Sequence, residues 1–166
     1  MLREVIFWLA RTDVATFVRH SSWAWAVLEI THFLGLSVLL GTIGLFDLRL
    51  MGYARAIPPR ALHRLVPLGI AGFLVNATSG VLFFMASPGL YVGNIAFEIK
   101  LVLLALAGLN VAAFYLTVKR AVLTLDADGD APMLARVMGG VSLALWVSVL
   151  VAGRMEAFYK PILPVL

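Results

Sequence analysis

Apolar residues gather in four long runs along the chain, and short polar segments separate the runs. The runs cover residues of about 23–46, 60–86, 97–118 and 134–153. A bilayer core of about 30 Å requires about 20 consecutive, mostly apolar residues in an α-helix, and each run meets that length. The pattern therefore predicts an all-α fold, a four-helix transmembrane bundle.

The first 20 residues follow a different pattern. Charged side chains interrupt them, and four apolar residues fall near one helical stripe: Phe7, Val14, Phe17 and Val18. Such a segment is typical of an amphipathic helix that lies in the membrane interface. We therefore expect residues 1–20 to form an N-terminal interfacial helix. Trp23 and Trp25 follow it and fit the aromatic belt at the start of a spanning helix.

Pro67 lies one to two turns inside the second apolar run. A proline ring has no N–H to donate, and it clashes with the carbonyl group one turn before it. We therefore expect a kink in the helix of residues 60–86 near this position.

Composition strengthens the prediction of a membrane protein. The chain of 166 residues is 62% hydrophobic and 13% charged, with a mean hydropathy of +0.99, whereas soluble domains carry about 25% charged residues. Little chain remains outside the four runs, so we expect one membrane domain over residues 1–166. The absence of cysteine excludes disulfides, thiolate metal sites and the attachment motif of c-type haem.

The net charge of +4 indicates topology more than a charged partner. Lysine and arginine favour the cytoplasmic side of a membrane. Seven of them lie near residues 47–64 and 119–136, and five lie on the opposite face. We therefore expect both termini on the periplasmic side of a cytoplasmic membrane, and no nucleic acid as a partner.

Glu29 and His32 lie inside the first apolar run. Ionisable side chains are costly within a bilayer, so they are candidates for a functional site. Residues three apart share one side of a helix. The two side chains therefore fit either a hydrogen-bonded pair that locks helix packing or a site for a ligand or a relayed proton.

Depth along the helices groups the remaining polar residues. With a rise of about 1.5 Å per residue, His32 lies roughly 14 Å from the outer end of its helix. Five residues fall in this outer half and are expected to converge on one site: Glu29, His32, Asn76, Lys100 and Arg154. His63 falls in the opposite half, on the order of 20 Å from His32. We therefore do not expect the two histidines to bind one haem together.

Several stretches resemble a family of small bacterial four-helix membrane proteins that is catalogued as a domain of unknown function. The resemblance spans residues of about 21–160. It rests on E-I-T-H-F-L-G (29–35), D-L-R-L-M-G (47–52), L-H-R-L-V-P (62–67), G-F-L-V-N-A-T-S-G-V-L-F-F (72–84), Y-V-G-N-I-A-F-E-I-K (91–100), A-G-L-N-V-A-A-F-Y (107–115) and G-R-M (153–155). At the level of the fold, the chain is also similar to b-type cytochrome and copper-resistance D-type membrane domains. The resemblance implies a bacterial inner membrane protein.

These features lead to a functional hypothesis, a b-type cytochrome-like protein that binds haem b for electron transfer or membrane redox chemistry. His32 would bind the iron, and Lys100 or Arg154 would face the propionates. His63 would serve a second haem, and copper bound by histidine and methionine is a variant of the same hypothesis. The expected partners are the lipid bilayer, further copies of the chain, and a quinone or redox protein.

Two alternatives stay open at this stage. The first is a small transporter or channel subunit with a protonatable site made by Glu29, His32 and Lys100. The second is a purely structural membrane oligomer. A membrane oxidoreductase is the enzyme class that the haem hypothesis would imply.

Overall fold

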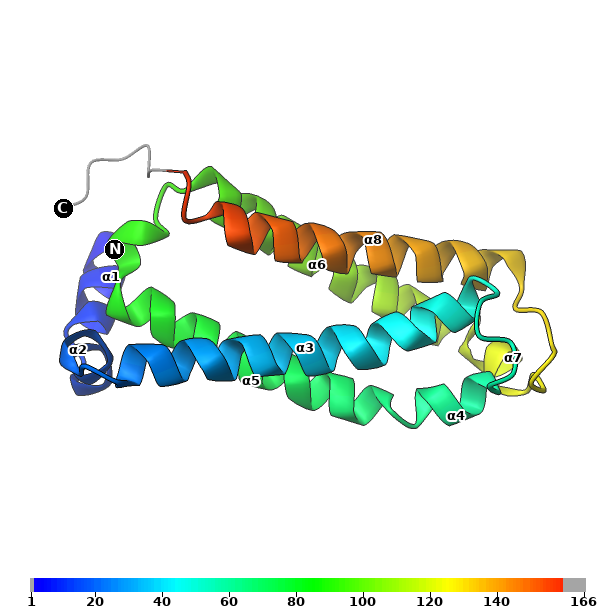
Figure 1. Ribbon diagram of the computed structural model, residues 1–166. Helices are drawn as coiled ribbons and strands as arrows, with labels where there is room; N and C mark the ends of the chain where they lie inside the picture. The colour runs from blue at the N-terminus through cyan, green and yellow to red at the C-terminus, as the bar shows by residue number, and fades with distance from the viewer. Residues whose placement is uncertain (1, 160–166) are drawn as a thin grey trace.

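The computed structural model describes residues 2–159, and all of the regular structure in that part of the chain is helical (Figure 1). Four segments there are long and apolar enough to cross a membrane. They are α3 (Ala24–Leu50), α4 (Pro59–His63) with α5 (Val66–Ala86), α6 (Ile95–Thr117) and α8 (Met133–Met155). The all-α four-helix transmembrane bundle is confirmed, and the protein is a multi-pass membrane protein.

Helix α3 is longer than the sequence pattern predicts. It continues past residue 46 to Leu50, although Asp47 and Arg49 are both charged residues. Both side chains are buried, with exposed fractions of 4% and 1%. The apolar pattern missed this extension because the polar side chains at the end of α3 point into the protein.

The second span breaks near Pro67, as expected. Helix α4 ends at His63 and α5 begins at Val66, so two residues separate the helices. Pro67 occupies one of the first positions of α5, where a missing N–H costs little because the first turn has no intrahelical acceptor. The sequence predicted one kinked helix, and the structure has two.

The interfacial segment also consists of two helices, α1 (Leu2–Ala10) and α2 (Asp13–His20). Arg11 and Thr12 separate them, and the Thr12 side chain accepts a hydrogen bond of 3.3 Å from the Ala15 amide at the start of α2. Both helices lie across one end of the bundle (Figure 1), which we call the α1–α2 end. Exposed apolar side chains on them include Phe7, Trp8, Val14 and Phe17, as an interfacial position requires.

The spans pack as two hairpins. Helix α3 packs against α5, and α6 packs against α8, while contacts between α3 and α8 join the hairpins. Within the first hairpin, formed by α3 and α5, the two backbones are in direct contact. A Cβ atom added to Gly72 would lie only 2.7 Å from the Gly35 carbonyl oxygen. Towards the α1–α2 end, α5 and α6 diverge (Figure 1). The fold is therefore an open pair of hairpins.

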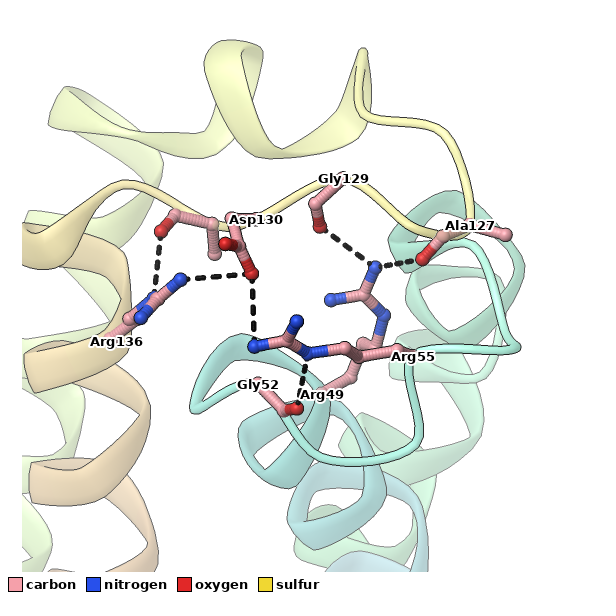
Figure 2. Close-up of polar contacts among 8 residues, drawn as sticks. Arg49, Gly52, Arg55, Ala127, Gly129, Asp130 and Arg136 are labelled. Carbon is pink, nitrogen blue, oxygen red and sulfur yellow. Dashed lines mark hydrogen bonds and ion pairs between the residues drawn. The ribbon is translucent and has the colours of Figure 1, made fainter.

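The opposite end, which we call the Arg49 end, is held together by polar contacts. Figure 2 shows the Arg49 guanidinium between two loops, where Nη2 donates to the carbonyl oxygens of Ala127 at 2.5 Å and Gly129 at 3.1 Å. Its Nε donates to the Ile57 carbonyl at 2.8 Å. A buried core cluster that includes Phe46, Leu62, Phe114 and Val122 lies beneath these contacts.

Arg55 and Arg136 bind a common carboxylate at the same end (Figure 2). Their distances to Asp130 Oδ1 are 3.2 Å and 2.9 Å. The basic residues of these loops were interpreted from sequence only as markers of topology. Arg49 and Arg55 also connect the end of α3 and the loop after it to the loop that precedes α8, and Arg136 connects that second loop to α8.

Candidate functional site

The His32 imidazole has its orientation fixed by the neighbouring helix. Its Nδ1 atom lies 2.8 Å from the Ser79 hydroxyl oxygen. That hydroxyl directs its single proton to backbone carbonyl groups, those of Val75 at 2.7 Å and Asn76 at 3.0 Å. This arrangement favours Ser79 as the acceptor and His32 as the donor. In that tautomer the proton is on Nδ1, and Nε2 has a lone pair.

The surroundings of His32 leave this lone pair available. No hydrogen bond to Nε2 is found among residues 2–159. Phe83 packs edge-on to the ring, with a centroid distance of 5.7 Å. A Cβ atom on Gly80 would lie 3.8 Å from His32 Cε1, an ordinary van der Waals distance, so Gly80 packs beside the ring. The imidazole is half-buried and can bind a metal or accept a proton through Nε2.

Asn76 is part of the same helix contact, as the sequence predicted, but it binds backbone. Its Nδ2 donates to the His32 carbonyl oxygen at 3.0 Å. This carbonyl lies opposite α5, and the amide holds the two helices in register at the depth of His32. Asn76 therefore positions the histidine and leaves its ring free.

Glu29 does not join the site. Its side chain is exposed on α3, and in the described part of the chain no ion pair or hydrogen bond links it to His32. Of the two alternatives drawn from sequence, the structure therefore does not form the hydrogen-bonded Glu29–His32 pair. Spacing along one helix made the pairing plausible, but the His32 ring faces α5, where Ser79 provides its partner.

Lys100 forms an ion pair with a residue that the sequence analysis missed. Its Nζ lies 3.1 Å from Glu156 Oε1, and the two side chains are only 18% and 14% exposed. Lys100 therefore has Glu156 as its ion-pair partner rather than either of the other two members of the protonatable site considered from sequence. Lys100 still lies close enough to interact electrostatically with His32. Glu156 lies three residues after the last apolar run, and the only signal in the sequence was that its level in the membrane matches that of Lys100.

Arg154 lies near this ion pair but points elsewhere. Its side chain is exposed, and its guanidinium carbon lies 5.6 Å from the centroid of the Phe158 ring. The five residues expected to form one site are thus only partly together. The structure joins His32 and Asn76 directly, brings Lys100 within electrostatic range, and leaves Glu29 and Arg154 at the surface.

Tyr91 extends the polar group around Glu156 into the loop before α6. Burial raises the pKa of the Tyr91 hydroxyl to about 12, and the negative charge of Glu156 adds to the effect. Phe97 packs against Tyr91 with a centroid distance of 5.2 Å. This aromatic side chain lies outside the membrane-spanning helices, at the α1–α2 end.

His63 belongs to a different group, near the Arg49 end. Its Nε2 lies 3.1 Å from the Tyr115 hydroxyl, and its ring packs edge-on to Phe46 at 5.7 Å. Lys119 places its ammonium group 4.4 Å from the centroid of the Tyr115 ring. The nitrogen that most often binds iron is therefore already occupied in His63, in contrast to His32.

Residues 2–159 do not bring together the side chains of a multi-ligand metal site. No cluster of three or more histidine, aspartate or glutamate side chains that could hold a metal ion is found there.

The fold therefore defines a helical multi-pass membrane protein with an oriented histidine between two spans. Searches against protein-family models, curated proteins and solved structures find no match to this chain. The resemblance to the bacterial four-helix family stays a prediction. Function is accordingly inferred from the geometry around His32.

Proposed function

We propose that this protein binds haem b within the bacterial inner membrane, with His32 as an axial ligand, and takes part in electron transfer. The orientation of His32 carries the proposal. Histidines that bind metals commonly donate their second ring N–H to an oxygen, which fixes the ring and makes the other nitrogen a better ligand. Ser79 accepts such a hydrogen bond at 2.8 Å.

The neighbouring residues support a planar cofactor beside α3 and α5. Bundle helices hold haem between facing side chains, and His32 has a small residue, Gly80, and an aromatic one, Phe83, beside its ring. Haem would supply one-electron transfer. Lys100 is already paired with Glu156 and Arg154 lies over the Phe158 ring, so neither cation is assigned to a propionate group.

The proposal narrows the hypothesis drawn from sequence. His63 is not included, because Tyr115 occupies its Nε2. The electron partner would be a quinone in the bilayer or a redox protein at the membrane surface. The excess of basic residues at the Arg49 end supports an orientation with the α1–α2 end and both termini in the periplasm.

The visible spectrum of the purified protein tests this proposal. Protein from haem-replete cells should show a Soret band, and His32→Ala should abolish the band while the protein remains folded. His63→Ala is the matched control, since it removes a histidine from the other half of the membrane and should keep the band. A colourless wild-type protein, or a band that depends on His63 alone, would contradict the proposal.

A proton-coupled transporter would use the same Nε2 atom as a proton acceptor. The geometry supports it less well, because Glu29 is apart from His32 and Lys100 is paired with Glu156. Proton uptake by a colourless protein, lost in His32→Ala, would favour this second function.

A further inference from the structure

The joint between the two hairpins contains a buried carboxyl group that the proposed haem site does not use. Asp47 lies on α3 with an exposed fraction of 4%, and Ser142 on α8 faces it with 5%. The Oδ2 atom of Asp47 is fully buried and has no hydrogen-bond partner in the described part of the chain. This carboxyl group is therefore both dry and incompletely paired.

The charged groups on the elements around Asp47 are engaged elsewhere. Arg49 binds three loop carbonyls. On α8, Arg136 binds Asp130 and the Ala131 carbonyl. On α4, His63 binds Tyr115, and Arg60 is exposed. Helix α5 contains no charged residue. No ion pair with Asp47 is found among residues 2–159, so its negative charge would lack compensation.

An isolated ionised carboxylate is so unfavourable in an apolar interior that the group takes up a proton instead. We propose that Asp47 is a proton-binding site, which holds a proton in the folded protein and loosens the α3–α8 joint when the proton is released. The neutral acid has an O–H that can donate to the Ser142 hydroxyl. Release transfers the proton to water and leaves a carboxylate that requires hydration.

The packing around Asp47 explains why hydration would separate the helices. A Cβ atom on Gly139 would lie 2.9 Å from the Asp47 carbonyl oxygen and 2.9 Å from Leu50 Cβ. The backbones of α3 and α8 therefore leave no layer of water between them at this level. Water can reach an ionised Asp47 only if the helices move apart, and these helices connect the two hairpins. Proton release at Asp47 is thereby coupled to the angle between the hairpins.

Infrared spectroscopy of the full chain in lipid, at neutral pH, tests the protonation state. The difference spectrum between wild type and Asp47→Asn should contain the carbonyl stretch of a protonated carboxylic acid. Ser142→Ala should shift that band, because it removes the partner of the acid. If the difference spectrum contains only carboxylate bands, the proposal is overturned. Should Asp47→Asn fail to fold, the presence or absence of the shift in Ser142→Ala decides.

Hydrogen–deuterium exchange tests the coupling to the joint. After correction for the intrinsic pH dependence of exchange, wild-type amides in residues 39–50 and 135–149 should lose protection as the pH is raised. Asp47→Asn, which cannot ionise, should keep protection, whereas Asp128→Asn at an exposed position should behave as wild type. Equal loss of protection in wild type and Asp47→Asn would overturn the coupling.

Discussion

His32 Nδ1 lies 2.8 Å from the Ser79 hydroxyl oxygen, and the other contacts of that hydroxyl favour His32 as the donor. The same oxygen lies 2.7 Å and 3.0 Å from two α5 carbonyl oxygens, either of which can accept the Ser79 proton. A serine on one span thus favours one tautomer of a histidine on another. The chemistry available at Nε2 depends on this contact.

Removal of the Ser79 hydroxyl should weaken haem binding without unfolding the protein. In Ser79→Ala the ring loses its fixed orientation, and an outer partner of a metal ligand is worth about 10- to 100-fold in affinity. Haem titration followed by the Soret absorbance measures the effect. Ser37→Ala is the control, because Ser37 makes a similar bond of 2.8 Å to the Phe33 carbonyl but has no imidazole partner. Equal affinities of the two variants would contradict the assigned role.

Gly72→Ala should destabilise the first hairpin. The new Cβ atom would lie 2.7 Å from the Gly35 oxygen and 2.9 Å from the Leu39 nitrogen, both backbone atoms that cannot rotate away. Overpacking of this kind costs about 1–3 kcal/mol. Thermal unfolding in detergent measures the loss. Gly41→Ala on α3 is the matched control, since nothing lies within 4 Å of its new Cβ atom. This variant should leave the unfolding temperature unchanged or raise it.

Arg49→Ala should open the Arg49 end of the protein. The substitution leaves three carbonyl groups without a donor, at a cost of about 1–3 kcal/mol for each that stays buried. We expect a lower unfolding temperature and faster proteolysis within residues 124–132. Arg120→Ala, at an exposed position on α7 (Lys119–Leu123), should show neither effect. Normal protease resistance of Arg49→Ala would argue against this role.

Tyr91 should make the protein less stable in alkali. The pKa of its hydroxyl is raised to about 12 in the folded state from about 10 in the unfolded chain. The folded state therefore holds the proton more tightly, and stability present below pH 10 is lost as the pH rises towards 12. Tyr91→Phe should reduce this loss in unfolding measurements across that range. Tyr53→Phe should not, because Tyr53 is 62% exposed.

The long helices could be predicted from sequence because their signal is local. A run of about 20 apolar residues predicts a spanning helix in that same run, and the proline at position 67 predicts a break at that same position. The extension of α3 to Leu50 gave no such signal, since Arg49 becomes buried only through carbonyl groups that lie far along the chain, at Ala127 and Gly129. A buried arginine and a solvated one have the same sequence pattern.

The candidate site was partly predictable for the same reason. His32 and Asn76 were identified because polar residues in apolar helices are costly. The expected partner of His32 was wrong because it was inferred from spacing along one helix. Glu29 is three residues away on α3, but the His32 ring contacts α5. Ser79 and Glu156 were missed, because a serine is common in membrane helices and Glu156 follows the last apolar run. Depth estimates place residues at a level in the membrane, but they do not specify which helix face turns towards which neighbour.

The contact between Gly35 and Gly72 has a consequence for the order of assembly. All residues that pair α3 with α5 precede residue 87, so the first hairpin can form while later residues are still being synthesised. Asp47 and Arg49 belong to that hairpin, yet Ser142, Ala127 and Gly129 emerge afterwards. Until the second hairpin arrives, water and lipid headgroups must solvate the end of α3. Dehydration of these two side chains is therefore among the last events of biogenesis.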